Sequence, residues 1–196
     1  MAEIDSQAVL SVEEMRLKNI TDTMQVAQKI VDGLAIDFQQ FTMEDFLAAV
    51  GESRKRQIFS FAIPMPPFVY GAWITDEERP YEYIFYDTNL SPLHQVHVQL
   101  HEVGHLLCGH ETLRVSGQNL TQLIEVIQTQ NLSSEASSLL MRATTDTGGD
   151  EREEEAEAIA TTIQSHVIQA ARMKELSVAV SNNTQIQKLL YDMGLS

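Results

Sequence analysis

The stretch HEVGHLLCGH at positions 101–110 decides how this chain folds. Ahead of it, Ser91 is a good helix cap and Pro92 suits the first helical position, while Gly109 favours a helix end. The sequence therefore predicts one helix from Pro92 to about Cys108. Leucine and valine fill most of its other positions, which indicates burial on nearly all sides. Buried imidazoles need polar partners or an ion.

His101 and His105 are four residues apart, so a helix places both imidazoles on one face within reach of a single ion. A catalytic zinc uses three protein ligands and keeps one position open for water. Glu102 follows the first histidine, where its carboxylate could take a proton from metal-bound water. The sequence therefore predicts a Zn²⁺ site with Glu102 as general base. The alternative is a histidine-rich helix whose imidazoles are satisfied by neighbours in the core.

The acidic run at 150–157 supplies candidates for the third ligand. A metzincin arrangement would need glycine at position 108 and histidine at position 111, where this chain has Cys108 and Glu111, so that pattern fails, although Glu111 stays an alternative candidate. A long helix should begin near Asp150, and its apolar stripe consists of Ala156, Ala160, Ile163 and Val167. Glu153 lies nearest the centre of that stripe, so it is the predicted third ligand.

Other polar residues of the two helices receive supporting roles. Glu157, one turn after Glu153, could hydrogen-bond a ligating imidazole and fix its tautomer. His97 lies on the same stripe as the two ligating histidines, and we expect it to contact the ligands or line the cleft, not to bind the ion. We expect Cys108 to act as a small apolar residue. The remaining acidic residues should face solvent at the helix N-terminus: Glu151, Glu154 and Glu155.

The rest of the chain predicts an α+β fold that is mostly helical. Residues 1–55 form N-terminal packing helices, with Thr42 as a cap, and residues 56–172 form the core. β-Branched and aromatic runs between 57 and 87 predict a small antiparallel sheet of about three strands, packed on the histidine helix. Residues 173–196 form a small C-terminal helical segment.

Composition narrows the classes of partner. The 28 acidic and 13 basic residues give a formal net charge of -15, which disfavours nucleic acid and anionic membranes and attracts a basic protein. A single cysteine cannot form an internal disulfide, which is typical of the cytoplasm. Neither an export signal nor a membrane-spanning run is evident.

HEVGHLLCGH followed by EEEAEAIA at 153–160 resembles the ImmA/IrrE family of zinc metallopeptidases, whose pattern is HExxH and then E-x-E-A-(D or N)-x-F-A. Glu157 stands where the family has Asp or Asn, and Ile159 where it has Phe. The resemblance covers about residues 55–170. It implies a zincin-like core, with zinc bound by His101, His105 and Glu153 and with Glu102 as base. It also implies helix-turn-helix repressors as substrates and a role in transcription regulation during stress responses.

These observations together predict a zinc endopeptidase whose substrate lies extended along the edge of the small sheet. Candidates for stabilising the oxyanion are the strand tyrosines, namely Tyr70, Tyr81, Tyr83 and Tyr86. Two alternatives stay open: a non-catalytic zinc-containing protein-binding module, such as a toxin-antitoxin component, and a metal-free helical regulator.

Overall fold

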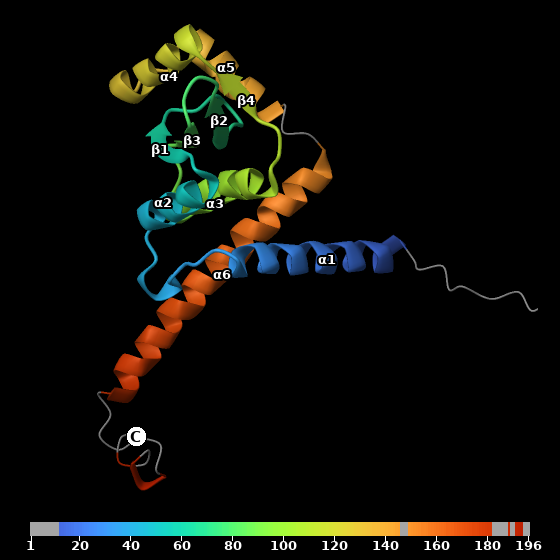
Figure 1. Ribbon diagram of the computed structural model, residues 1–196, viewed down its shortest axis with the longest axis vertical. Coiled ribbons are helices and arrows are strands. Elements are labelled where there is room, and N and C mark those ends of the chain that lie inside the picture. Colours follow the sequence, from blue (N-terminus) through green and yellow to red (C-terminus); the bar gives the residue numbers. More distant parts are fainter. Residues whose placement is uncertain (1–11, 146–148, 182–187, 189–190, 194–196) are drawn as a thin grey trace, which may run out of the picture.

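The computed structural model describes residues 12–145, 149–181, 188 and 191–193. It is an α+β protein with helices on both faces of a four-stranded sheet (Figure 1). The helices are α1 (Val12–Asp32), the 3-10 helix η1 (Phe38–Gln40), α2 (Met43–Arg54), α3 (Pro92–Cys108), α4 (Gly117–Thr129), α5 (Ser134–Thr145) and α6 (Asp150–Ser181). The strands are β1 (Gln57–Ile63), β2 (Gly71–Asp76), β3 (Tyr81–Asp87) and β4 (Leu113–Val115).

The sheet is mixed, with strand order β1-β3-β2-β4, so the expectation of three antiparallel strands was wrong in part. β2 and β3 form the expected antiparallel pair, but β1 runs parallel to β3 and β4 runs parallel to β2. The connection that contains the prolines of residues 64–67 leads from β1 to β2. β3 then returns between β2 and β1, so it runs antiparallel to β2 and parallel to β1. β4 has only three residues, too few to show a pattern in the sequence.

Side chains alternate between the two faces of the sheet and build two separate cores. Trp73 and Ile84 belong to a cluster with α1, α2, α3 and α6. Ile74 and Phe85, one residue further along each strand, belong to a cluster with α4 and α5. Figure 1 shows the same layers, with α4 and α5 on one side of the sheet and α2 and α3 on the other. The histidine helix α3 therefore lies under one face of the sheet.

The predicted helix caps are confirmed. The Ser91 side chain accepts a hydrogen bond from the backbone N–H of His94, and Pro92 begins α3. Gly109 ends the helix with φ of 72°, a left-handed conformation that glycine adopts without strain. The Thr42 hydroxyl accepts from the Asp45 backbone N–H at 3.1 Å and so caps α2.

Helix α6 begins at Asp150, as expected, and runs unbroken for 32 residues. It passes through the boundary expected at residue 173, because this part of the chain contains neither glycine nor proline. The first part of the expected C-terminal segment is thus a continuation of α6, and most of the remainder lies outside the described residues. No helix within the described ranges is long and apolar enough to cross a membrane.

Candidate metal site

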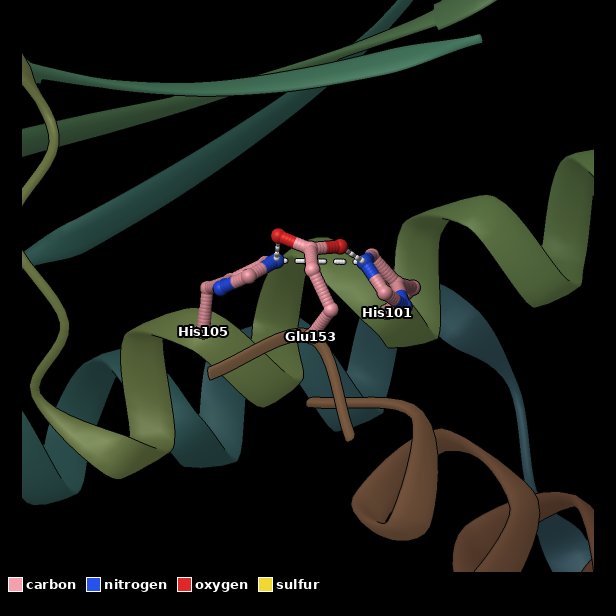
Figure 2. Close-up of side chains that lie close together, drawn as sticks. All are labelled: His101, His105 and Glu153. Atoms are coloured by element: carbon pink, nitrogen blue, oxygen red, sulfur yellow. Dashed lines mark hydrogen bonds and ion pairs between the residues drawn. The ribbon is translucent and has the colours of Figure 1, made fainter. Parts of the chain in front are cut away.

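Two imidazoles and one carboxylate converge where α3 crosses α6. His101 Nε2 lies 3.1 Å from His105 Nε2, and the Glu153 oxygens lie 3.2 Å and 3.4 Å from these two nitrogens. Figure 2 shows the Glu153 carboxylate between the two rings. Ligands at about 2.0–2.2 Å from a tetrahedral ion lie roughly 3.3–3.5 Å apart, close to the spacing found here. These side chains are therefore close enough to hold a metal ion.

The donor residues differ in their exposure to solvent. His105 is 2% exposed, whereas about half of the Glu153 side chain is exposed. Burial, followed by the nearby charges of His101, His110 and Arg152, lowers the pKa of His105 to about 3. His105 is therefore neutral near pH 7, and a neutral imidazole has the free electron pair that a metal ion requires.

Glu102 lies between α3 and β2, 8% exposed. A Cβ atom on Gly71 would be only 2.6 Å from Glu102 Oε1, so the carboxyl group lies directly against the strand backbone. Burial, and then the charge of Glu153, raises the pKa of Glu102 to about 8, although a hydrogen bond with the backbone of Trp73 acts in the opposite direction. A carboxyl group with this pKa can accept or release a proton near neutral pH.

Glu157 and His97 lie beside the group and not in it. The Glu157 Oε2 atom is 3.4 Å from His101 Nδ1 and 3.2 Å from His97 Nε2. His97 Nδ1 is in turn 3.4 Å from the side-chain oxygen of Gln164. The carboxylate thus contacts the ring nitrogen of His101 that faces away from Glu153, where it can orient the imidazole.

Glu155 makes a contact that the sequence did not predict. Glu155 was expected to face solvent only. That expectation was wrong, because its Oε2 atom lies 2.9 Å from His110 Nε2. His110 Nδ1 is also 2.8 Å from His105 Nδ1. Periodicity along α6 alone could not find this contact, because His110 follows the helix end at Gly109 and its position depends on the turn there. The one feature of the sequence that could have suggested this contact is the position of His110, soon after His101 and His105.

Cys108 lies in the same region, within 4.8 Å of ligand atoms of His110 and Glu155. Burial and the Glu155 charge raise the pKa of the Cys108 thiol to about 11, so it is protonated near neutral pH. His94, by contrast, is exposed and its ring contacts Ser91 at 3.2 Å.

Two of the tyrosine candidates point away from this site. The Tyr83 hydroxyl donates a hydrogen bond to Asp76 Oδ2 at 3.1 Å, within the core that faces α4 and α5. Burial raises the pKa of Tyr83 to about 12. Tyr81 packs edge-on against Phe59 at the same face. Both expectations were therefore wrong, because these side chains alternate to the far side of the sheet.

A cavity of about 480 Å³ opens beside two of the three donor residues. Its polar wall includes His101, Glu153 and Glu157, and its apolar wall includes Ile20 and Met24 of α1. Among the described residues that line this cavity there is no tyrosine, so none of the four oxyanion candidates borders it. His101 and Glu153 are thus next to an open space between α1 and α6.

Fold and site together define an α+β protein with a candidate metal site of two histidines and one glutamate, supplied by two helices. No protein-family model matches the chain, and it has no significant match among curated proteins.

Proposed function

We propose that this protein is a zinc-dependent endopeptidase. The observation that carries the proposal is the convergence of the His101, His105 and Glu153 donor atoms next to a buried acid, Glu102. Two imidazole nitrogens and one carboxylate oxygen are a common ligand set of catalytic zinc, and a fourth position remains for water or substrate. The resemblance of both motifs to the ImmA/IrrE family points to the same chemistry.

Zinc bound by these residues would polarise the scissile carbonyl group and make water a stronger nucleophile. Glu102 takes the proton of the attacking water and delivers it to the departing amine. The hydrogen bond with Trp73 and the contact with Gly71 hold the Glu102 carboxyl group in place between helix and strand. Glu157 keeps the His101 ring oriented through its Nδ1 atom.

The backbone of β2 offers a place for an extended substrate. The Tyr70 carbonyl accepts from the Asp87 N–H, so the backbone groups of Gly71 face the opposite side of the strand. On that side β4 pairs with β2 only from Ile74 to Asp76. Within the described part of the chain, no strand therefore pairs with Gly71 on this side. A peptide added beside Gly71 would extend the sheet directly above Glu102.

The charge of the chain supports a basic protein as substrate. Its net charge of -15 attracts positively charged partners and accelerates their encounter. Helix-turn-helix repressors carry basic surfaces that bind DNA, and they are the substrates that the family resemblance implies. A cytoplasmic location fits such a substrate and the free thiol of Cys108.

Co-expression with a candidate helix-turn-helix repressor tests the proposal. We expect a defined repressor fragment by mass spectrometry with the wild type and intact repressor with Glu102→Gln, which keeps the size of the side chain. Zinc content of both purified proteins is the control, since Glu102 is not a ligand. Equal repressor loss with both proteins would indicate a non-catalytic, zinc-containing binding module instead.

A further inference from the structure

Three side chains form a continuous chain of contacts that leads away from the metal-binding group. His105 Nδ1 lies 2.8 Å from His110 Nδ1, and His110 Nε2 lies 2.9 Å from Glu155 Oε2. The side chains of His105 and His110 are 3% and 6% exposed, so water does not compete strongly for the contact between the two rings, whereas the Glu155 side chain is 42% exposed. His105 turns its other nitrogen, Nε2, toward His101 and Glu153.

Only one assignment of ring protons satisfies all these contacts with neutral imidazoles. A carboxylate accepts hydrogen bonds but donates none, so His110 must carry its proton on Nε2, facing Glu155. Its Nδ1 is then an acceptor, and the 2.8 Å contact requires the proton of His105 on Nδ1. The Nε2 atom of His105 is left with a free electron pair that points at the candidate metal position.

We propose that His110 and Glu155 are positioning residues that hold His105 in its Nδ1–H tautomer, and so prepare Nε2 to bind the metal ion. The inference rests on the proposed function, because it assigns these residues to the same zinc site. Partners of this kind fix both the ring orientation and the basicity of a ligating histidine. Here the partner of the histidine is a second histidine, which a carboxylate orients in turn.

A second metal ion bound by Cys108, His110 and Glu155 is the competing interpretation of these residues. His110 Nε2 cannot donate to Glu155 and bind an ion at the same time, and its 2.9 Å distance already suits a hydrogen bond. An ion on His110 Nε2 would leave the His110 proton on Nδ1, where it would donate to His105 Nδ1. The proton of His105 would then sit on Nε2 and block the nitrogen that faces His101 and Glu153.

Ring-nitrogen NMR of the metal-free protein tests the tautomers directly. We expect the proton of His105 on Nδ1 and that of His110 on Nε2. The variant His110→Asn keeps an acceptor near the Nδ1 position and should preserve the His105 tautomer, whereas His110→Leu should lose it. A proton on His105 Nε2 in the wild type, or an unchanged tautomer in His110→Leu, would overturn the proposal.

Zinc titration of the same proteins provides the second readout. We expect one bound zinc, an affinity about 10–100-fold lower in His110→Leu and Glu155→Ala, and partial recovery in His110→Asn. Cys108→Ala and Glu154→Ala are matched controls and should bind zinc as the wild type does. A second zinc that Cys108→Ala abolishes would overturn the proposal in favour of a second ion.

The two proposals fail in different ways. Wild-type affinity in His110→Leu would overturn the positioning role and leave the zinc peptidase intact. A wild type that binds no zinc would overturn both. Circular dichroism and thermal unfolding of each variant show whether it is folded. If His110→Leu does not fold, His110→Asn provides a variant with conservative packing.

Discussion

Gly104 of α3 lies against the backbone of Ala156 in α6. A Cβ atom built on Gly104 would be 2.5 Å from the Ala156 carbonyl oxygen and 2.8 Å from its Cα atom, distances that only glycine avoids. His101 and His105 flank Gly104 in sequence, and Glu153 lies one helical turn before Ala156. The close crossing of the two helices at this glycine therefore brings the third donor to the histidine pair.

Replacing Gly104 with alanine should push α6 away from α3, because the atoms in its way belong to the backbone and cannot rotate aside. We expect a loss of about 1–3 kcal/mol in the free energy of unfolding, together with weaker zinc binding. Urea unfolding and zinc titration measure the two effects. Gly149→Ala is the matched control, since its Cβ would meet no heavy atom within 4 Å. Wild-type stability and affinity in Gly104→Ala would contradict this role of the glycine.

Glu153→Gln should weaken zinc binding more than about 100-fold, beyond the effect typical of residues that only touch a ligand. The amide has the size of the carboxylate but lacks its charge and is a poorer metal ligand. Competition with a chelator of known affinity measures the change. The neighbouring Glu154→Gln removes the same charge from the same helix turn and should bind zinc as the wild type does. Equal affinities of the two variants would exclude Glu153 as a ligand.

Much of this site follows from local sequence rules. Ser91, Pro92 and Gly109 determine where α3 begins and ends, because caps act within one turn of a helix. The pair of histidines shares a face for the same local reason. Glu153 could be chosen over its neighbours because helical periodicity turns it toward the apolar stripe.

The features that the sequence did not show depend on contacts between distant segments. The parallel pairing of β1 with β3 follows from strand order, which alternating side chains do not encode. The contact of Glu155 with His110 joins residues 45 positions apart and exists only after α6 has docked on α3. Periodicity treats each helix as isolated, so it placed Glu155 in solvent.

The metal-free protein should lose stability as pH rises, because of Glu102. Its pKa is about 8 in the folded protein against an ordinary value of 4.5, so the folded state holds a proton that the unfolded chain releases. This contribution to stability is fully present below pH 4.5 and is lost as pH rises through about 8. Each tenfold difference in acidity corresponds to about 1.4 kcal/mol, so the loss reaches a few kcal/mol.

Urea unfolding of the wild type and Glu102→Gln in the presence of a chelator measures this contribution across that pH window. Glutamine does not titrate, so the variant should show a smaller decline toward high pH. Added zinc should reduce the decline of the wild type, because a nearby cation favours the charged carboxylate. If the free energies of unfolding of the two metal-free proteins change with pH in parallel, the raised pKa of Glu102 is contradicted.

Gly71→Ala should separate the role of Glu102 from that of the metal ligands. The new Cβ would lie 2.6 Å from Glu102 Oε1 and 2.5 Å from Val98 Cγ1, both side-chain atoms that can move. We expect the Glu102 carboxyl group to leave its place against Trp73 while His101 and its partners stay.

Because a positioned general base contributes about 10²–10⁴-fold, repressor cleavage by Gly71→Ala should fall by up to about 100-fold, with zinc affinity changed less than about twofold. Rates from mass spectrometry and zinc titration provide the comparison, with Gly149→Ala as control. Unchanged cleavage would show that the base does not need its contact with β2, and a matching loss of zinc would show that the substitution disturbs the whole site.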